Sequence, residues 1–249
     1  MRKIFVYFIS LLLIIDMQGL RAQDTVLFPL KIRAGFDLIG PGFYFNNRTN
    51  MNMEGFISYD RNEKLAYVLE SGYSDYKYSQ YNYDYNSRGA FARLGLDLNL
   101  LKPDKAGGKY WAGLGFRYGM SIFDSQTTAF KHENYWGETL SSIPAKKMFA
   151  HYIEVAPGVK TEVFKNFSMG WTIRLKMLLS GGGGKHLKPI SVPGYGNGGR
   201  MTNAGISYFI VWNIPYRTKT VIIKPELPSE EDEEYEDTDV STGQQRIGF

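Results

Sequence analysis

The sequence predicts an all-β protein, an eight-stranded antiparallel transmembrane β-barrel of the outer-membrane type. Residues 148–164 and 167–180 alternate between large apolar and small or charged side chains, with a Lys165-Asn166 turn between them. A period of two indicates β-strands rather than helices. Each run is longer than the roughly 9–11 residues with which a tilted strand crosses a bilayer. The interruptions along the chain alternate between short and long, as in outer-membrane barrels.

The two faces of these strands predict which one meets lipid. In residues 167–180, one face carries Phe, Met, Trp, Ile and Leu, whereas the other carries mainly Gly, Ser, Thr, Arg and Lys. An eight-stranded barrel has an interior just wide enough for side chains. The small and charged residues therefore suit the interior, and the bulky apolar residues suit lipid. The sequence predicts an inside-out barrel.

The first 22 residues have the pattern of a secretory signal peptide. Arg2 and Lys3 precede the apolar run of residues 4–15, and Leu20-Arg21-Ala22 provides a small-residue cleavage site. The apolar run is too short for a membrane helix. We expect cleavage after Ala22 and localisation in the bacterial outer membrane. The chain has no cysteine, so we expect no lipoprotein anchor, no disulfides and no thiolate chemistry.

Eight segments with strand periodicity follow in order, and we expect one barrel domain over residues 23–219. The predicted strands are residues 30–38, 51–60, 65–76, 90–100, 109–124, 148–164, 167–180 and 201–216. The connections after the second, fourth and sixth strands are short, and the others are long. Because outer-membrane barrels have short periplasmic turns and long outer loops, both termini are expected in the periplasm.

Three of the long connections have distinctive compositions. Residues 39–50 contain Gly40-Pro41-Gly42, which indicates a loop. The third predicted strand runs into the tyrosine-rich loop YKYSQYNYDYNSR. Residues 181–200 are rich in glycine and include SGGGGKH, which lacks the G-x-x-x-x-G-K-[ST] pattern of a phosphate-binding loop. We interpret this segment as a flexible loop.

The last predicted strand resembles the recognition signal by which barrels engage the barrel-assembly machinery. Gly205, Tyr208 and Trp212 stand at the expected alternation. The chain continues beyond this strand, so we do not assign the signal to Phe249. We expect the protein to be a client of the assembly machinery.

Longer strings of the sequence resemble a known family. They are WAGLGFRYGMSIFD, NYWGE, HYIEVAPGVKTEVFKNFSMGWTIRLKMLLS, VPGYG and AGISYFIVWNIPYRTK. In this order they resemble an uncharacterised (domain-of-unknown-function) family of Bacteroidota outer-membrane β-barrel proteins, over most of residues 28–219. The resemblance implies export and an outer-membrane barrel, and it provides no catalytic residues to carry over. The acidic tail departs from the family pattern.

Ten charged residues fall on the predicted lumen face. They are Glu54, Glu70, Arg93, Asp97, Arg117, Glu154, Lys160, Glu162, Arg174 and Lys176. One interpretation is a selective pore or a buried active site. The other is a paired network that fills the barrel, which the narrow interior favours because buried charges must be paired.

A lipid-modifying enzyme at the barrel rim is an alternative function. It would need a nucleophile, a base and an orienting acid that converge. His151 lies near Ser141, Ser142 and Glu154 along the chain, but Glu154 has the opposite parity and should point inward. His132 and His186 lie in predicted loops without metal-ligand spacing. We therefore assign no catalytic, cofactor-binding or metal residues.

Aromatic residues in the outer loops suggest another alternative, a surface glycan-binding adhesin. The candidates are Tyr78, Tyr81, Tyr83, Tyr85, Tyr135 and Trp136. Aromatic faces can stack on sugars or on a partner protein. The competing interpretation is an interfacial aromatic girdle with a hairpin that extends beyond the membrane.

Charge is segregated along the chain. Residues 23–224 carry 25 Lys/Arg against 15 Asp/Glu, a net charge of +10, whereas residues 225–249 carry nine acids and Arg246. Basic outer loops suit outer-membrane lipids and anionic lipopolysaccharide. Residues 220–249 are predicted to be an acidic, disordered periplasmic tail. This tail is either simply solvated, a docking strip for a basic periplasmic partner, or a weak cation sink. Nucleic acid is excluded as a partner by the compartment.

Together these features predict a non-enzymatic outer-membrane protein, an accessory or scaffold of the cell envelope. The rim enzyme and the adhesin remain the alternatives.

Overall fold

The computed structural model describes residues 25–46, 48–81, 83–135, 137–183 and 188–222. The expected signal peptide, residues 1–22, lies outside the described residues, as do residues 223–249 of the predicted tail. The barrel unit spans Leu27–Thr220. None of the helices in the described residues is long and apolar enough to cross a membrane.

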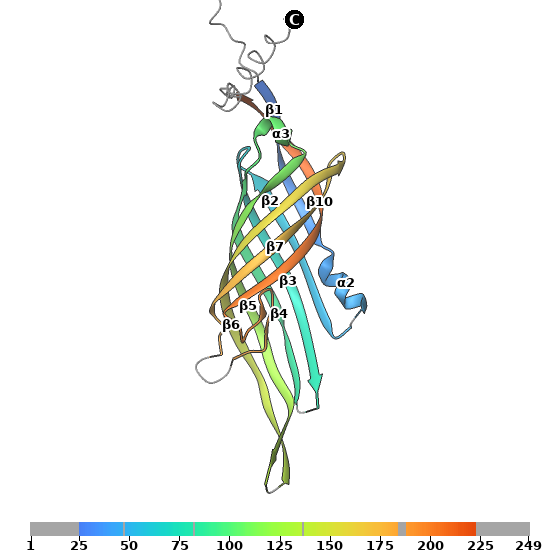
Figure 1. Cartoon of the computed structure of the whole chain (residues 1–249), viewed down its shortest axis with the longest axis vertical. Coiled ribbons are helices and arrows are strands. Elements are labelled where there is room, and N and C mark those ends of the chain that lie inside the picture. The colour runs from blue at the N-terminus through green and yellow to red at the C-terminus, as the bar shows by residue number, and fades with distance from the viewer. Residues whose placement is uncertain (1–24, 47, 82, 136, 184–187, 223–249) are drawn as a thin grey trace, which may run out of the picture. The chain divides into compact units, whose positions relative to one another are not determined.

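Within the described residues, eight strands close into an antiparallel barrel (Figure 1). The strands are β1 (Thr25–Asp37), β2 (Asn50–Asp60), β3 (Leu65–Gln80), β4 (Tyr83–Asn99), β5 (Tyr110–Asn134), β6 (Gly137–Phe164), β7 (Phe167–Ser180) and β10 (Thr202–Ile222). Each strand from β1 to β7 pairs with its sequence neighbour, and β10 lies between β7 and β1 and closes the ring. The predicted fold class is confirmed.

The two ends of the barrel differ in their connections. Residues 61–64, 100–109 and 165–166 make the short connections at one end, which we call the short-turn end. The second of these contains a single-turn helix, α3 (Pro103–Ala106), which begins at a proline. The opposite end, the hairpin end, carries the long connections and lies at the bottom of Figure 1.

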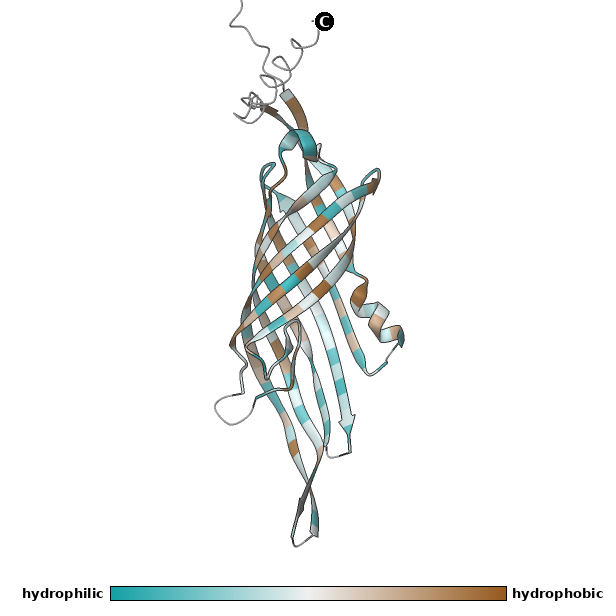
Figure 2. Ribbon diagram, viewed as in Figure 1, coloured by the Kyte–Doolittle hydropathy of each residue, from teal (hydrophilic) through white to brown (hydrophobic). Residues whose placement is uncertain are grey.

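The alternation of apolar and polar side chains follows the barrel wall (Figure 2). On β7, Ile173 is 41% exposed whereas its neighbour Thr172 is 7% exposed. The register continues this pattern across strands, because Phe116 of β5 lies opposite Val155 of β6, which lies opposite Leu175 of β7. All three side chains are exposed on the outside. The apolar face therefore points outward, as predicted.

Two hairpins extend much further than the sequence predicts. β3 and β4 remain paired to Gln80 opposite Tyr83, so the predicted tyrosine-rich loop is wrong. β5 and β6 remain paired to Asn134 opposite Gly137, so the predicted loop of residues 125–147 is also wrong. At ~3.3 Å per residue, residues 124–134 lengthen β5 by roughly 35 Å beyond the barrel region that the sequence predicts. These strands were hidden because tyrosine and polar side chains alternate there, and the outward face no longer carries an apolar band.

The predicted loop of residues 39–50 contains a helix, α2 (Ile39–Asn46). Asp37 caps its first turn, because Asp37 Oδ2 accepts a hydrogen bond from Gly40 N (3.2 Å). Pro41 lies in this first turn, where a missing N–H is tolerated. Gly40 is required there, since a Cβ would lie 2.1 Å from the Asn52 carbonyl oxygen of β2. The Gly-Pro-Gly sequence thus begins a helix instead of preventing one.

The connection between β7 and β10 also differs from the prediction of a flexible loop. Residues 184–187 lie outside the described residues, but residues 188–200, which we call the lumen loop, fold back into the barrel. The lumen loop contains the two-residue strands β8 (Ser191–Val192) and β9 (Gly196–Asn197), which pair with each other. Val192 and Tyr195 are buried against Tyr152 of β6 and Phe123 of β5.

Candidate functional site: the barrel lumen

Glu70 of β3 is the centre of an ion-pair network in the lumen. Its carboxylate accepts hydrogen bonds from Arg93 of β4 (2.8 Å), Arg117 of β5 (3.0 Å) and Arg174 of β7 (2.9 Å). The three arginines come from three strands, and each points inward because it occupies the inward position of the strand alternation. All four side chains are buried.

Other carboxylates complete the coordination of these arginines. Glu54 of β2 lies 2.8 Å from Arg93 and 2.6 Å from Arg174. Glu154 of β6 lies 2.6 Å from the guanidinium of Arg174. Arg93 also donates from Nε to the hydroxyl of Tyr152 (2.9 Å). Each of these buried charges therefore has an opposite charge at hydrogen-bonding distance, which offsets much of the desolvation that burial costs.

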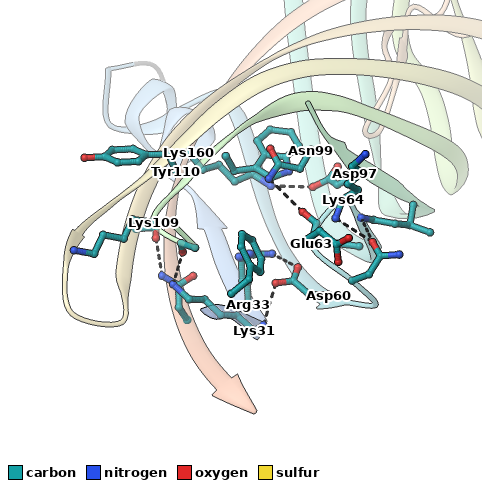
Figure 3. Close-up of a pocket in the computed structure, with 18 of the residues that line it drawn as sticks. Lys31, Arg33, Asp60, Glu63, Lys64, Asp97, Asn99, Lys109, Tyr110 and Lys160 are labelled. Carbon is teal, nitrogen blue, oxygen red and sulfur yellow. Dashed lines mark hydrogen bonds and ion pairs between the residues drawn. The ribbon is translucent and has the colours of Figure 1, made fainter. Parts of the chain in front are cut away.

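The network continues toward the short-turn end through Asp97 of β4. Arg117 binds one oxygen of Asp97 (2.6 Å), and Lys160 of β6 binds the other (2.9 Å). Figure 3 shows Lys160 reaching Asp97 in this way. Across the network, the carboxylates of Glu54, Glu70, Asp97 and Glu154 balance the charges of Arg93, Arg117, Lys160 and Arg174. The network is neutral.

The other two residues of the predicted lumen set lie outside this neutral network. Glu162 pairs with Lys31 of β1 at the short-turn end, and it also accepts from Asn166 N (3.1 Å). Lys176 of β7 donates to the carbonyl oxygen of Gly194 (2.8 Å). The structure thus joins eight of the ten predicted residues into one network and places one at each end.

Sequence reasoning missed several inward polar residues. Arg33 of β1 pairs with Asp60 of β2, which also accepts from Lys31 N (3.0 Å), and Figure 3 shows the three together. Tyr152 of β6 is another, because its buried hydroxyl accepts a hydrogen bond from Arg93. The sequence places each of these residues on the inward face of its strand, so the alternation of the strand could have identified it.

The lumen loop contacts the network from the hairpin-end side. The carbonyl oxygen of Gly194 accepts from Arg93 Nη2 (2.9 Å) as well as from Lys176. The Ser191 carbonyl oxygen accepts from Ser87 of β4 (2.9 Å). Gly194 has φ +73°, and a Cβ there would lie 2.5 Å from the ring of Phe91. The loop therefore depends on glycine to approach the network so closely.

Little space remains beside Glu70 and between the network and the short-turn end. The cavity beside Glu70, Asp97 and Arg117 has a volume of about 10 Å³. The cavity at the short-turn end, shown in Figure 3, has a volume of about 30 Å³. A single water needs about 10–15 Å³ of such space. These cavities hold a few water molecules at most.

The histidine candidate does not form a catalytic constellation. His151 lies on the outward face of β6, where its Nδ1 is 3.2 Å from the Tyr118 hydroxyl. Glu154 points inward to Arg174, and Ser141 lies opposite Phe130 in the projecting hairpin. The side chain of His132 and all of His186 lie outside the described residues. Over the described part of the chain, no group of three His, Cys, Asp or Glu residues has metal-binding geometry.

The predicted outer-loop aromatics do not form one surface. Tyr85 is buried and bonds Ser125 (3.0 Å). Tyr78 and Tyr83 pack against each other, with ring centroids 5.7 Å apart. Tyr81 and Tyr135 are 85% and 94% exposed. Trp136 lies outside the described residues.

The predicted assembly-signal residues lie on β10 at the closing seam of the barrel. Trp212 is exposed on the outer face. Tyr208 N donates to Asp37 of β1 (2.9 Å), and the Tyr208 hydroxyl donates to the sulfur of Met169 (3.4 Å). Gly205 lies opposite Arg174 of β7.

Comparison with protein families gives one match, to the family described as "Domain of unknown function (DUF6048)", over residues 1–219. Among curated proteins, no sequence matches the chain.

Several solved structures are similar to the chain, including the following three. The N-terminal β-barrel domain of Pseudomonas aeruginosa OprF has 12% identity and a TM-score of 0.32, with 78% of this chain and 100% of that chain covered. Acinetobacter baumannii CarO has 13% identity and a TM-score of 0.38, with 76% and 98% covered. Neisserial surface protein A has 11% identity and a TM-score of 0.30, with 78% and 100% covered. Because these TM-scores are below 0.5, the barrel assignment rests on the strand pairing of this chain.

Proposed function

We propose that this chain, which belongs to the DUF6048 family, is a non-enzymatic β-barrel of the bacterial outer membrane that serves as an accessory or scaffold of the cell envelope. The single observation that carries the proposal is the neutral ion-pair network that blocks the lumen, because the cavities beside Glu70 and between the network and the short-turn end have space for only a few water molecules. Such an interior suits a stable support for outer loops better than a pore.

The exterior of the barrel supports a membrane location. Large apolar side chains are exposed on its outward face, while its interior holds the paired charges together with a small apolar cluster of Phe56, Val68, Phe209 and Val211. In water such a surface would be an aggregation hazard, because exposed apolar patches on soluble proteins are small. In a bilayer it is the expected arrangement. The proposed orientation puts the short-turn end in the periplasm and the hairpin end outside the cell.

The proposed partners follow from charge. Lys146 and Lys147 are exposed in the projecting β5–β6 hairpin, and Arg88 and Arg200 are exposed at the same end. These cations suit anionic lipopolysaccharide and other outer-membrane lipids.

In this proposal the barrel-assembly machinery inserts the chain, and the acidic tail binds a basic periplasmic protein. Deleting residues 225–249 should then leave the barrel folded and remove a salt-sensitive partner from pull-downs.

Cysteine labelling tests the location and the orientation. The chain has no cysteine, so single substitutions report one position each. Tyr135→Cys at the hairpin tip should react with a membrane-impermeant maleimide in intact cells. Lys165→Cys in a short turn should react only after the outer membrane is opened. Equal labelling of both variants in intact cells, or recovery of the protein outside the outer-membrane fraction, would refute the proposal.

A further inference from the structure

The seam between β1 and β10 is incomplete at the hairpin end. Leu38 N donates to the Tyr208 carbonyl oxygen (2.9 Å), and at this point β1 ends and α2 begins. In an antiparallel pair, residues 202–207 of β10 would lie beside residues 39–44, which are helical instead. Within the described residues, this part of β10 therefore has a strand neighbour only on the β7 side. The barrel wall has a lateral gap between β10 and α2.

A cavity of about 780 Å³ passes through this gap. Its inner lining includes Arg93, Arg174 and Lys176, which belong to the lumen. Its lining also includes Phe43 of α2 and Ile206 of β10, which are 65% and 56% exposed on the outer surface. Because lumen-facing and outward-facing residues line the same cavity, the space connects the lumen with the apolar exterior. Its volume lies in the range of small-molecule binding sites, about 300–1,000 Å³.

The outer part of the cavity is mainly apolar and the inner part is polar. Ile39, Phe43, Met51 and Ile206 line the part that passes through the wall, whereas Asn52, Ser74 and Ser207 lie on inward positions of their strands. A ligand that fits both parts is amphipathic, with a hydrocarbon chain in the gap and a polar head group in the lumen.

The charges on the inner wall indicate the sign of that head group. Arg93, Arg174 and Glu54 belong to the neutral network. Asp37 accepts backbone N–H groups from Tyr208 (2.9 Å) and Gly40 (3.2 Å). Lys176 lies within 4.0 Å of no carboxylate among the described residues, and its three N–H donors have one acceptor, the Gly194 carbonyl oxygen. Asp75 also lines the cavity, but it takes the outward position of β3 opposite Met51. One of its carboxylate oxygens lies 4.0 Å from Lys77 Nζ, and the other has no hydrogen bond among the described residues. On the inner wall, the unused hydrogen-bonding capacity of the charged residues is therefore mainly that of Lys176.

We propose that this cavity binds a single-chain anionic amphiphile, with its carboxylate or phosphate head group on Lys176 and its acyl chain through the gap between α2 and β10. Gly205 and Ser207, the inward residues of β10 at this level, make the necessary room. The membrane location proposed above determines only how the ligand arrives. Binding to the purified protein is independent of it.

Gly205 offers a way to fill the cavity without disturbing the wall. A Cβ at Gly205 would have Lys176 Nζ at 3.9 Å as its nearest neighbour, an ordinary contact. Gly205→Trp should therefore occupy the ligand position. Gly42→Trp is the matched control, because a Cβ at Gly42 of α2 meets nothing within 4 Å and Gly42 does not line the cavity. Lys176→Met removes the cation, and Lys165→Met removes a cation from the opposite end.

Native mass spectrometry of the full chain, released from non-ionic detergent, measures the binding. The ligands are dodecanoate, dodecyl phosphate and the neutral dodecyl glucoside. Heat-dependent gel mobility shows that each variant is folded. We expect a saturable one-to-one adduct with at least one anionic ligand and none with the neutral one. Lys176→Met should weaken it at least ~10-fold and Gly205→Trp should abolish it, while both controls bind like the wild type.

The outcomes separate the sources of the ligand. Stronger binding of dodecanoate assigns the site to fatty acids, and stronger binding of dodecyl phosphate assigns it to lipid phosphates. Equal binding of neutral and anionic ligands, no adduct with either anion, or wild-type binding by folded Lys176→Met would overturn the proposal. If Gly205→Trp fails to fold, Gly205→Leu replaces it, and undiminished binding by that variant would also overturn the proposal.

Discussion

Replacing Glu70 with glutamine removes the carboxylate that three guanidinium groups share. Arg93, Arg117 and Arg174 would keep their positions around a neutral amide whose NH₂ group is itself a donor. The network would then carry an uncompensated positive charge at Glu70, where the adjoining cavity has a volume of only about 10 Å³. Removing one partner from a buried ion pair costs about 3–5 kcal/mol, and Glu70 has three partners at 2.8–3.0 Å.

Urea unfolding of the purified barrel, followed by heat-dependent gel mobility, measures this loss. For an m-value of ~2 kcal/mol/M, the expected destabilisation lowers the unfolding midpoint by about 2 M. Glu138→Gln is the control, because Glu138 pairs with Lys131 (2.8 Å) in the exposed hairpin, where an ion pair contributes about 0–1 kcal/mol.

A double variant tests the physical reason. Adding Arg117→Met to Glu70→Gln restores neutrality, so the two substitutions together should destabilise the barrel less than the sum of their separate effects. Additive effects would show that charge balance is not what stabilises the lumen. A Glu70→Gln midpoint equal to that of Glu138→Gln would refute the reasoning altogether.

Three further predictions follow from other parts of the molecule. Ile173→Arg should prevent stable membrane assembly, because a cation near the bilayer midplane costs about 2–4 kcal/mol. Leu140→Arg, in the projecting hairpin, should assemble normally. Equal membrane yields of the two variants would contradict the assigned lipid face. Gly194→Ala should strain the lumen loop by about 1–3 kcal/mol, because the φ of residue 194 is +73° and a Cβ there would be too close to the ring of Phe91. Limited proteolysis should therefore cut residues 188–200 of Gly194→Ala faster than the same residues of the control variant Gly42→Ala. The hydrogen bond from Lys219 (2.8 Å) lowers the pKa of Glu63 in the turn of residues 61–64. The contribution of the Glu63 carboxylate to stability is therefore present above the usual carboxyl pKa and is lost as the pH falls through the lowered pKa. The difference in unfolding midpoint between wild type and Glu63→Gln should disappear at low pH, and a difference that grows at low pH would contradict this reasoning.

The strands of the membrane region could be predicted because their two faces meet different environments. Lipid outside and polar contacts inside impose a period of two, and residues 167–180 show it so clearly that their predicted bounds match β7. The same parity placed Glu70 and Arg174 in the lumen. Beyond the apolar region, both faces of a hairpin are polar, so the alternation weakens and Tyr76–Gln80 and Tyr83–Arg88 resembled a loop.

The contacts of the lumen could not be predicted from parity. Which carboxylate meets which arginine depends on strand register and barrel closure. Glu70 lies opposite Arg93 in the β3–β4 register, but it meets Arg174 across the lumen. The lumen loop was missed for another reason: its glycines indicated flexibility, although Gly194 uses its conformational freedom to approach Phe91 and Tyr152. The lateral gap also depends on α2, whose capping by Asp37 was not recognised.

The central claim is that the ion-pair network and the lumen loop block passage along the lumen. Ion conductance across a planar lipid bilayer tests this claim most directly. The account predicts that the reconstituted wild-type barrel shows no sustained conductance. It also predicts no sustained conductance for a variant without residues 188–198, because the network of Glu70 and the three arginines still fills the barrel on the side of the short-turn end. Steady wild-type channels of open-porin size, measured on protein whose heat-dependent gel mobility shows that it is folded, would contradict it.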